Sequence, residues 1–177
     1  MVRLGLVLLL ALMASAPSVQ AFCGCRVPKV PRCAGSATKH RLTLRIDLAV
    51  QDGTVELITQ SGPYHAPVGD FDGKNLLALV MPRGEVFQGF LEETVAIIAG
   101  TMHGATAEVT TEAVFAPGEY ELLLFVDLVA GGGIGPQRGD IAAFDNTTCD
   151  PTGVSVRFAV GCEDAVTTLT NRHFIIF

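Results

Sequence analysis

Two carboxylates and an amide lie close together in one short polar segment, at Asp70, Asp72 and Asn75. Side chains of this type supply the oxygen ligands that Ca²⁺ prefers, and a tight loop could direct all three toward one ion. Calcium takes about six to eight oxygens, so these side chains form an incomplete set. The alternative, which this shortfall favours, is a solvated turn whose aspartates accept backbone N–H groups. The segment therefore gives a calcium candidate and a turn as its competitor.

The segment from Val68 to Leu77 also resembles the opening of the calcium loop in the FG-GAP repeats of β-propellers. Those loops continue through further acidic residues and recur many times. In this chain Lys74 stands where another carboxylate would be expected, and the segment occurs once. The length of the chain and the single copy exclude a propeller.

Sulfur and nitrogen side chains make copper a second candidate metal. Cys23 and Cys25 are two residues apart, so their thiolates could converge on Cu(I), and Met102-His103 could act together with Met81. A disulfide at the cysteines and ordinary core packing of the methionines are the alternatives that an oxidising compartment favours. None of the four histidines lies at a spacing typical of zinc sites.

Templates for catalysis and nucleotide binding are missing from the sequence. A Gly-x-Ser-x-Gly motif does not occur, and the glycine-rich stretch 131–135 lacks the Lys and helix of a phosphate loop. Asp127 and Asp140 flank that stretch, with Asp145 nearby, and could meet across its mouth to hold a metal ion, but the residues from 128 to 138 add no further carboxylate. The two carboxylates of a glycosidase need not be close in the sequence, so residue spacing does not exclude such a pair. The absence of tryptophan, however, leaves little aromatic surface on which a sugar ring could stack. The sequence therefore favours a non-catalytic protein.

The N-terminus is typical of a secretory signal peptide. Arg3 gives a positive start, residues 4–13 are almost wholly apolar, and residues 19–21 supply small or modest side chains for cleavage. We expect residues 1–21 to be removed and the mature chain to be secreted, periplasmic or held at the cell surface. The net charge of −6 argues against nucleic-acid binding, and no second apolar run is long enough to cross a membrane.

All five cysteines follow this leader, and an exported chain usually oxidises its cysteines to disulfides. We expect Cys149 to pair with Cys162, because the two bracket one strand, and Cys33 to pair with Cys25 or Cys23. The remaining thiol would be free, or would join two copies of the chain covalently. A lipid anchor at Cys23 is an alternative, but the bulky residue before it does not fit a lipobox.

The elements that must position these residues follow a two-residue period. From Leu42 to Val50 apolar and polar side chains alternate strictly, as in a half-buried strand. Asp52-Gly53 is typical of a type I′ hairpin turn, which would place Val50 opposite Val55. Residues 61–73 are expected to be loop, because Gly, Pro and Asp recur at short intervals.

Further apolar runs are separated by turn residues and occur at 75–81, 94–99, 105–115, 120–129, 154–160, 165–170 and 173–177. For 94–99 a helix is the alternative, and 120–129 is expected at the centre of a sheet because it is apolar on both faces. The pattern predicts an all-β fold, an antiparallel β-sandwich spanning 41–177, with a small β-barrel as the alternative. Residues 22–40 would form a lead-in rich in cysteine and proline.

The segment Ala116-Pro117-Gly118-Glu119-Tyr120, followed by an apolar strand, resembles the entry to a late strand in immunoglobulin-like and transthyretin-like domains of exported bacterial proteins. The resemblance extends over residues 114–144 and implies an immunoglobulin-like sandwich. It also implies that the hydroxyl of Tyr120 bonds back to the chain near the bend. Folds of this kind serve many functions, so the resemblance implies no activity.

The sequence predicts an exported, non-catalytic structural or binding module, with a protein or a cell surface as its partner. Its contact elements would be the loops 61–73 and 131–139, because rigid sandwiches carry function on loops. A small exported protein that binds calcium or copper is the second hypothesis. An enzyme whose residues meet only in the fold is the third. Asn146 begins a glycosylation sequence that applies only in a eukaryotic secretory route.

Overall fold

The computed structural model of the chain describes residue 33 and residues 38–59, 62–83, 94–129, 138–143 and 156–176. Within these ranges the chain forms strands joined by turns and short 3-10 segments, which confirms the all-β class. No helix there is both long and apolar enough to span a membrane. The predictions for the leader, for Asp145 and Asn146, and for Cys23, Cys25 and Cys149 fall outside the described residues.

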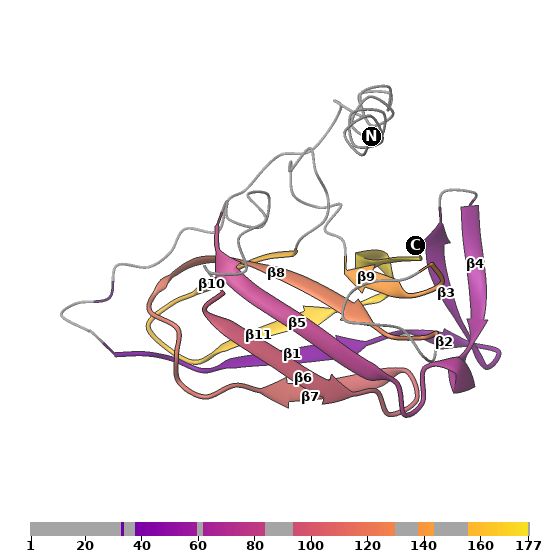
Figure 1. Cartoon of the computed structure of the whole chain (residues 1–177), viewed down its shortest axis with the longest axis horizontal. Helices are drawn as coiled ribbons and strands as arrows, with labels where there is room; N and C mark the ends of the chain where they lie inside the picture. Colours follow the sequence, from indigo (N-terminus) through magenta and orange to yellow (C-terminus); the bar gives the residue numbers. More distant parts are fainter. Residues whose placement is uncertain are drawn as a thin grey trace, which may run out of the picture.

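Two sheets pack against each other as a β-sandwich (Figure 1). The smaller sheet has the order β11-β1-β7, formed by β11 (Ala165–Leu169), β1 (Leu42–Asp47) and β7 (Thr106–Thr110). The larger sheet contains the sequence β6-β5-β8, formed by β6 (Ala96–Thr101), β5 (Asn75–Pro82) and β8 (Gly118–Val126). Strand β10 (Val156–Val160) pairs with the first half of β8. The connections β6–β7 and β10–β11 each pass from one sheet to the other.

The larger sheet continues beyond β8 through β9 (Ile141–Ala143), β12 (Phe174–Ile176) and β3 (Thr54–Thr59). Strand β3 pairs with both β2 (Val50–Gln51) and β4 (Gly62–Pro67). In Figure 1 the β3–β4 hairpin stands at one end of the sandwich. The pairs β1–β11 and β12–β3 are parallel and the other strand pairs of the described chain are antiparallel, so the predicted β-sandwich is confirmed and its sheets are mixed.

The two-residue period places alternate side chains in the core. Strand β1 buries Leu42, Leu44 and Ile46, and strand β8 likewise buries Leu122, Leu124 and Val126. Strand β8 has neighbours on both sides, as its apolar length predicts. Residues 96–101 form a strand rather than the alternative helix.

The run from Leu42 to Val50 is divided between the two sheets, although its alternation predicts one strand. Asn171, at the start of the 3-10 turn η5 (Asn171–His173), contacts the backbone at this division. Its side-chain oxygen accepts the Ala49 N–H at 2.6 Å, and its side-chain nitrogen donates to the carbonyls of Ala49 and Glu56. These bonds satisfy the backbone where the chain changes sheets. The hairpin at Asp52-Gly53 is confirmed, with Val50 opposite Val55.

Strand β4 lies inside the segment that the sequence predicts to be loop. Its register with β3 runs from Thr54 opposite Pro67 to Thr59 opposite Gly62. Proline cannot donate to a ladder, but it is tolerated on an edge strand where the missing N–H would face solvent. Because Pro63 and Pro67 lie on this edge strand, they also limit pairing with a further strand.

The disulfide of the described chain joins Cys33 to Cys162, with Cα atoms 5.5 Å apart. The expected pairing of Cys149 with Cys162, and of Cys33 with Cys25 or Cys23, was therefore wrong, because each cysteine forms one disulfide. Those expectations relied on closeness along the chain, whereas the parallel pairing of β1 and β11 brings distant segments together. The Asp164 carboxylate accepts the Arg41 N–H at 2.8 Å and fixes this junction.

The Tyr120 hydroxyl donates to the Ala116 carbonyl at 2.8 Å, which confirms its predicted role at the bend. Its ring stacks on Phe158, with centroids 5.7 Å apart, and meets the edge of Phe115 at 5.2 Å. Burial raises the pKa of the Tyr120 hydroxyl above its ordinary value. The bond and the ring contacts together hold the entry to β8 against the core.

Replacing this residue (Tyr120→Phe) keeps the ring and removes one hydrogen bond, so we expect a loss of about 1 kcal/mol of unfolding free energy near neutral pH. The raised pKa means that the unfolded chain releases this proton at lower pH than the folded chain. The Tyr120 contribution is therefore complete below about pH 10 and falls as pH rises toward the folded-state pKa. Urea unfolding at pH 7 and about pH 11 tests this, and an equal alkaline decline in both proteins would contradict it.

Candidate functional site

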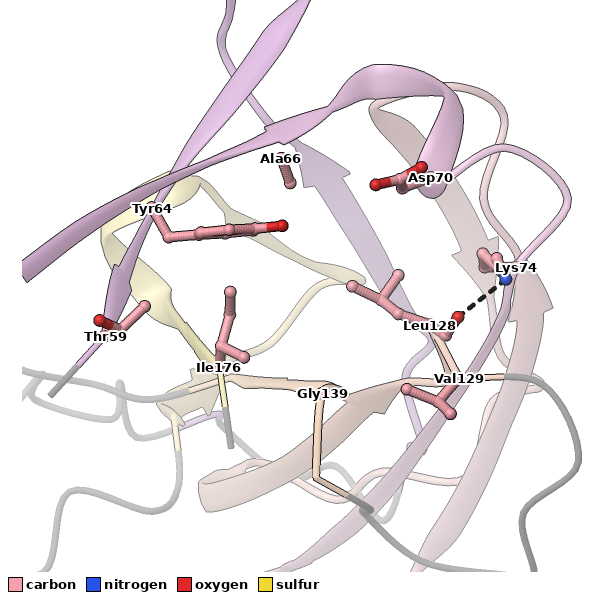
Figure 2. Close-up of a pocket in the computed structure, with 9 residues that line it drawn as sticks. All are labelled: Thr59, Tyr64, Ala66, Asp70, Lys74, Leu128, Val129, Gly139 and Ile176. Atoms are coloured by element: carbon pink, nitrogen blue, oxygen red, sulfur yellow. Dashed lines mark hydrogen bonds between the residues drawn. The ribbon is translucent and has the colours of Figure 1, made fainter. Parts of the chain in front are cut away.

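A cleft of about 360 Å³ opens at the end of the sandwich that carries the β3–β4 hairpin. Figure 2 shows Tyr64 and Ala66 on the hairpin side and Leu128 and Val129 on the opposite side, with Ile176 below Tyr64 in this view. Its volume lies toward the lower end of the range for small-molecule sites, about 300–1,000 Å³. The cleft is thus large enough for a small ligand.

The hairpin wall continues the face of the larger sheet that lines the core. Tyr64 lies opposite Leu57 and Ala66 lies opposite Val55, and residues opposite each other share a face. Leu57 and Val55 are fully buried, yet Tyr64 is 48% exposed. The apolar face therefore extends past the part that the smaller sheet covers and becomes a wall of the cleft.

Two polar side chains in the cleft make no bond within the part of the chain that the structure describes. The carboxylate of Asp70 and the hydroxyl of Tyr64 both point into the cavity in Figure 2, and neither has a hydrogen-bond or ion-pair partner among the described residues. Two further lining residues carry polar groups: the Thr59 hydroxyl donates to the Gly62 carbonyl at 2.7 Å, and the Lys74 ammonium donates to the Leu128 carbonyl at 2.8 Å. An ammonium has three donors, so two stay available for a ligand.

Asp70 ends the 3-10 turn η2 (Val68–Asp70), which is fastened on both sides. The Val68 N–H donates to the Gly53 carbonyl, and the next residue, Phe71, is fully buried. The Asp72 carboxylate accepts the Gly104 N–H at 2.8 Å. These contacts fix the backbone that presents Asp70 to the cleft.

The calcium candidates therefore have different surroundings. Asp70 faces the cleft, Asp72 bonds to the backbone as the turn alternative expects, and Asn75 is exposed at the start of β5. Among the described residues, no three His, Cys, Asp or Glu side chains gather in a way that could hold a metal ion. Calcium at these positions stays a prediction. For the copper candidate, Met102 is fully buried in the core and Met81 is 3% exposed.

The opposite wall depends on Asp140, which is 2% exposed. Its carboxylate accepts the N–H groups of Leu128 and Val129 at 3.0 and 3.1 Å. Gly139 has a φ of +103°, and a Cβ there would lie 2.8 Å from the Val129 side chain, so glycine permits the close approach. The sequence suggested Asp140 only as a metal ligand with Asp127, and missed this role. An aspartate just after a glycine-rich loop was the available signal.

Removing the Asp140 carboxylate should loosen this wall. Asp140→Ala leaves two N–H groups without an acceptor, so we expect a loss of about 2 kcal/mol in unfolding free energy. Asp140→Asn retains an acceptor oxygen and should lose about half as much. Urea unfolding measures the loss, and amide hydrogen exchange at Leu128 and Val129 localises it. Equal losses in the two variants, or unchanged exchange, would show that the carboxylate does not hold this turn.

The histidines that the structure describes have structural surroundings. The His173 ring nitrogen accepts the Thr170 N–H at 3.0 Å and caps η5. His40 is 8% exposed, and its backbone pairs with Phe115. His65 and His103 are exposed. No pair of these side chains faces the cleft, which is lined by one carboxylate and one ammonium.

Comparison with protein families, with curated proteins and with solved structures found no match.

Proposed function

We propose that this chain is an exported, non-catalytic binding module that uses a β-sandwich as a rigid scaffold. The cleft between the β3–β4 hairpin and the β8–β9 connection is its ligand site. The observation that carries the proposal is the pairing of an apolar lining with unbonded polar groups, those of Asp70 and Tyr64. A concave, mostly apolar site with a few convergent polar groups is the usual form of a small-molecule site.

Two observations support export and an immunoglobulin-like or transthyretin-like fold. The Cys33–Cys162 disulfide fits an oxidising compartment, where such bonds persist. The packed sheets and the bond from Tyr120 to the chain fit the sandwich domains that the sequence resembles. The site lies on segments close to the loops expected to make contacts, because Asp70 belongs to 61–73 and Gly139 to 131–139.

Filling the cleft from its rim tests the proposal. Val129 is 39% exposed and lines the cleft, so Val129→Trp should occupy the cavity without entering the core. Ile97, on β6, is 67% exposed and does not line the cleft, and Ile97→Trp is the matched control. The probes are phenethylamine and 3-phenylpropionate, small aromatic compounds of opposite charge.

We expect at least one probe to shift the amide resonances of residues around the cleft in the wild type. Val129→Trp should abolish these shifts, and Ile97→Trp should leave them intact. Shifts spread over the whole surface, or binding that survives Val129→Trp, would overturn the proposed site.

A further inference from the structure

We propose that the cleft takes a short zwitterionic ligand with an apolar body, namely a free apolar amino acid or a dipeptide. This inference rests on the proposed function and names the ligand class of the same site. Asp70 would receive the ammonium group of the ligand and Lys74 its carboxylate. The apolar body would lie against the ring of Tyr64 and the side chains of Leu128 and Ile176 (Figure 2).

Two side chains of opposite charge lie in one small cavity. Asp70 and Lys74 both line the cleft, yet no ion pair within 4.0 Å joins them, although both belong to the described residues. Asp70 has no other partner in the described chain, and Lys74 uses one donor on the Leu128 carbonyl. Each charge can therefore contact a separate group of the ligand.

Leaving either the Asp70 or the Lys74 charge without a partner beneath a bound ligand costs binding free energy. A ligand that carries one charge would satisfy one residue and cover the other, and covering an unpaired charge with apolar surface is unfavourable. A zwitterion satisfies both charges, and hydrogen bonds to charged groups are stronger than neutral ones. The arrangement therefore favours ligands with one ammonium and one carboxylate.

The lining and the size of the cleft argue against larger and more highly charged ligands. A divalent cation needs several oxygen ligands, and Asp70 is the single carboxylate among the lining residues. A nucleotide would need more positive charge than one lysine supplies. The volume of about 360 Å³ suits a ligand of the size of an amino acid or a dipeptide.

Three probes that share a phenyl ring but differ in their charged groups show which charges the cleft binds. Phenylalanine carries both groups, 3-phenylpropionate carries the carboxylate alone, and phenethylamine carries the ammonium alone. In titrations followed by amide chemical shifts at one ionic strength, we expect phenylalanine to bind about tenfold more tightly than either of the others. Equal affinity for all three would overturn the zwitterion and leave the cleft as a ligand site. No shift around the cleft with any probe would overturn the proposed function itself.

Variants that remove one charge at a time test which group of the ligand Asp70 and Lys74 each contact. Asp70→Asn should weaken phenylalanine binding about tenfold and should tighten 3-phenylpropionate binding, because it removes the charge that this ligand leaves unpaired. Lys74→Gln should weaken both ligands. The matched controls are Glu112→Gln and Lys39→Gln, which change the same charges at exposed positions that do not line the cleft. Asp70 makes no bond in the described chain, so its variant should fold normally. Unchanged phenylalanine binding in Asp70→Asn would overturn the assignment.

Discussion

Replacing both Cys33 and Cys162 with serine should lower the free energy of unfolding by about 4–5 kcal/mol. The disulfide joins residues that are 129 positions apart, and a cross-link over a long loop restricts the unfolded chain most strongly. The bond also lies beside the junction where β11 begins to pair with β1. Changing both cysteines avoids leaving either one free to pair elsewhere.

Urea unfolding of the double variant and of the wild type, each with and without dithiothreitol, measures this effect. Reduced wild type should match the double variant. The reductant should have little effect on the double variant, because its structural bond is already absent. A loss below about 1 kcal/mol would contradict the expected role of a bond that closes so long a loop.

The second large effect is expected at Arg157, whose guanidinium is 3.2 Å from a carboxylate oxygen of Glu121. The two residues face each other across β8 and β10, and the Glu121 side chain is 2% exposed. Arg157→Met leaves a buried carboxylate without this partner, which should lower the free energy of unfolding by about 3 kcal/mol. The loss arises from the stranded charge more than from the missing attraction.

Two further variants separate these causes. Glu121→Leu combined with Arg157→Met removes both charges and should recover most of the stability, because apolar replacements of buried ion pairs are often well tolerated. Arg45→Met is the matched control, since Arg45 and Glu108 form a cross-strand pair at 2.7 Å with side chains 48% and 54% exposed. The control should lose less than about 1 kcal/mol. A double variant no more stable than Arg157→Met would contradict the explanation.

The sequence predicted the features that depend on neighbours along the chain. Alternation from Leu42 identified a half-buried strand, and Asp52-Gly53 identified the turn that follows it, with the correct register. The resemblance at the bend before Tyr120 implied that its hydroxyl bonds back to the chain, and the acceptor is the Ala116 carbonyl. In each case the controlling interaction spans only a few residues, so the pattern contains the information that is needed.

The features that the sequence did not predict depend on contacts between distant segments. The Cys33–Cys162 bond follows from the parallel pairing of β1 and β11, which no local pattern indicates. The side chain of Asn171, 122 positions away from Ala49, bonds to the backbone where the first apolar run passes from one sheet to the other. The cleft also joins residues from η2, β3, β4, β12 and the β8–β9 connection, so the sequence could single out Asp70 but could not place it in one cavity with Leu128 and Ile176.

The most direct test of the cleft as a ligand site uses tyrosine fluorescence during titration with phenylalanine. The chain has two tyrosines and no tryptophan, and Tyr120 is packed in the core while Tyr64 lines the cleft. We expect phenylalanine to cause a saturable change in tyrosine emission, which Tyr64→Phe abolishes and Tyr120→Phe retains. A titration without change, or the same change in Tyr64→Phe, would contradict it.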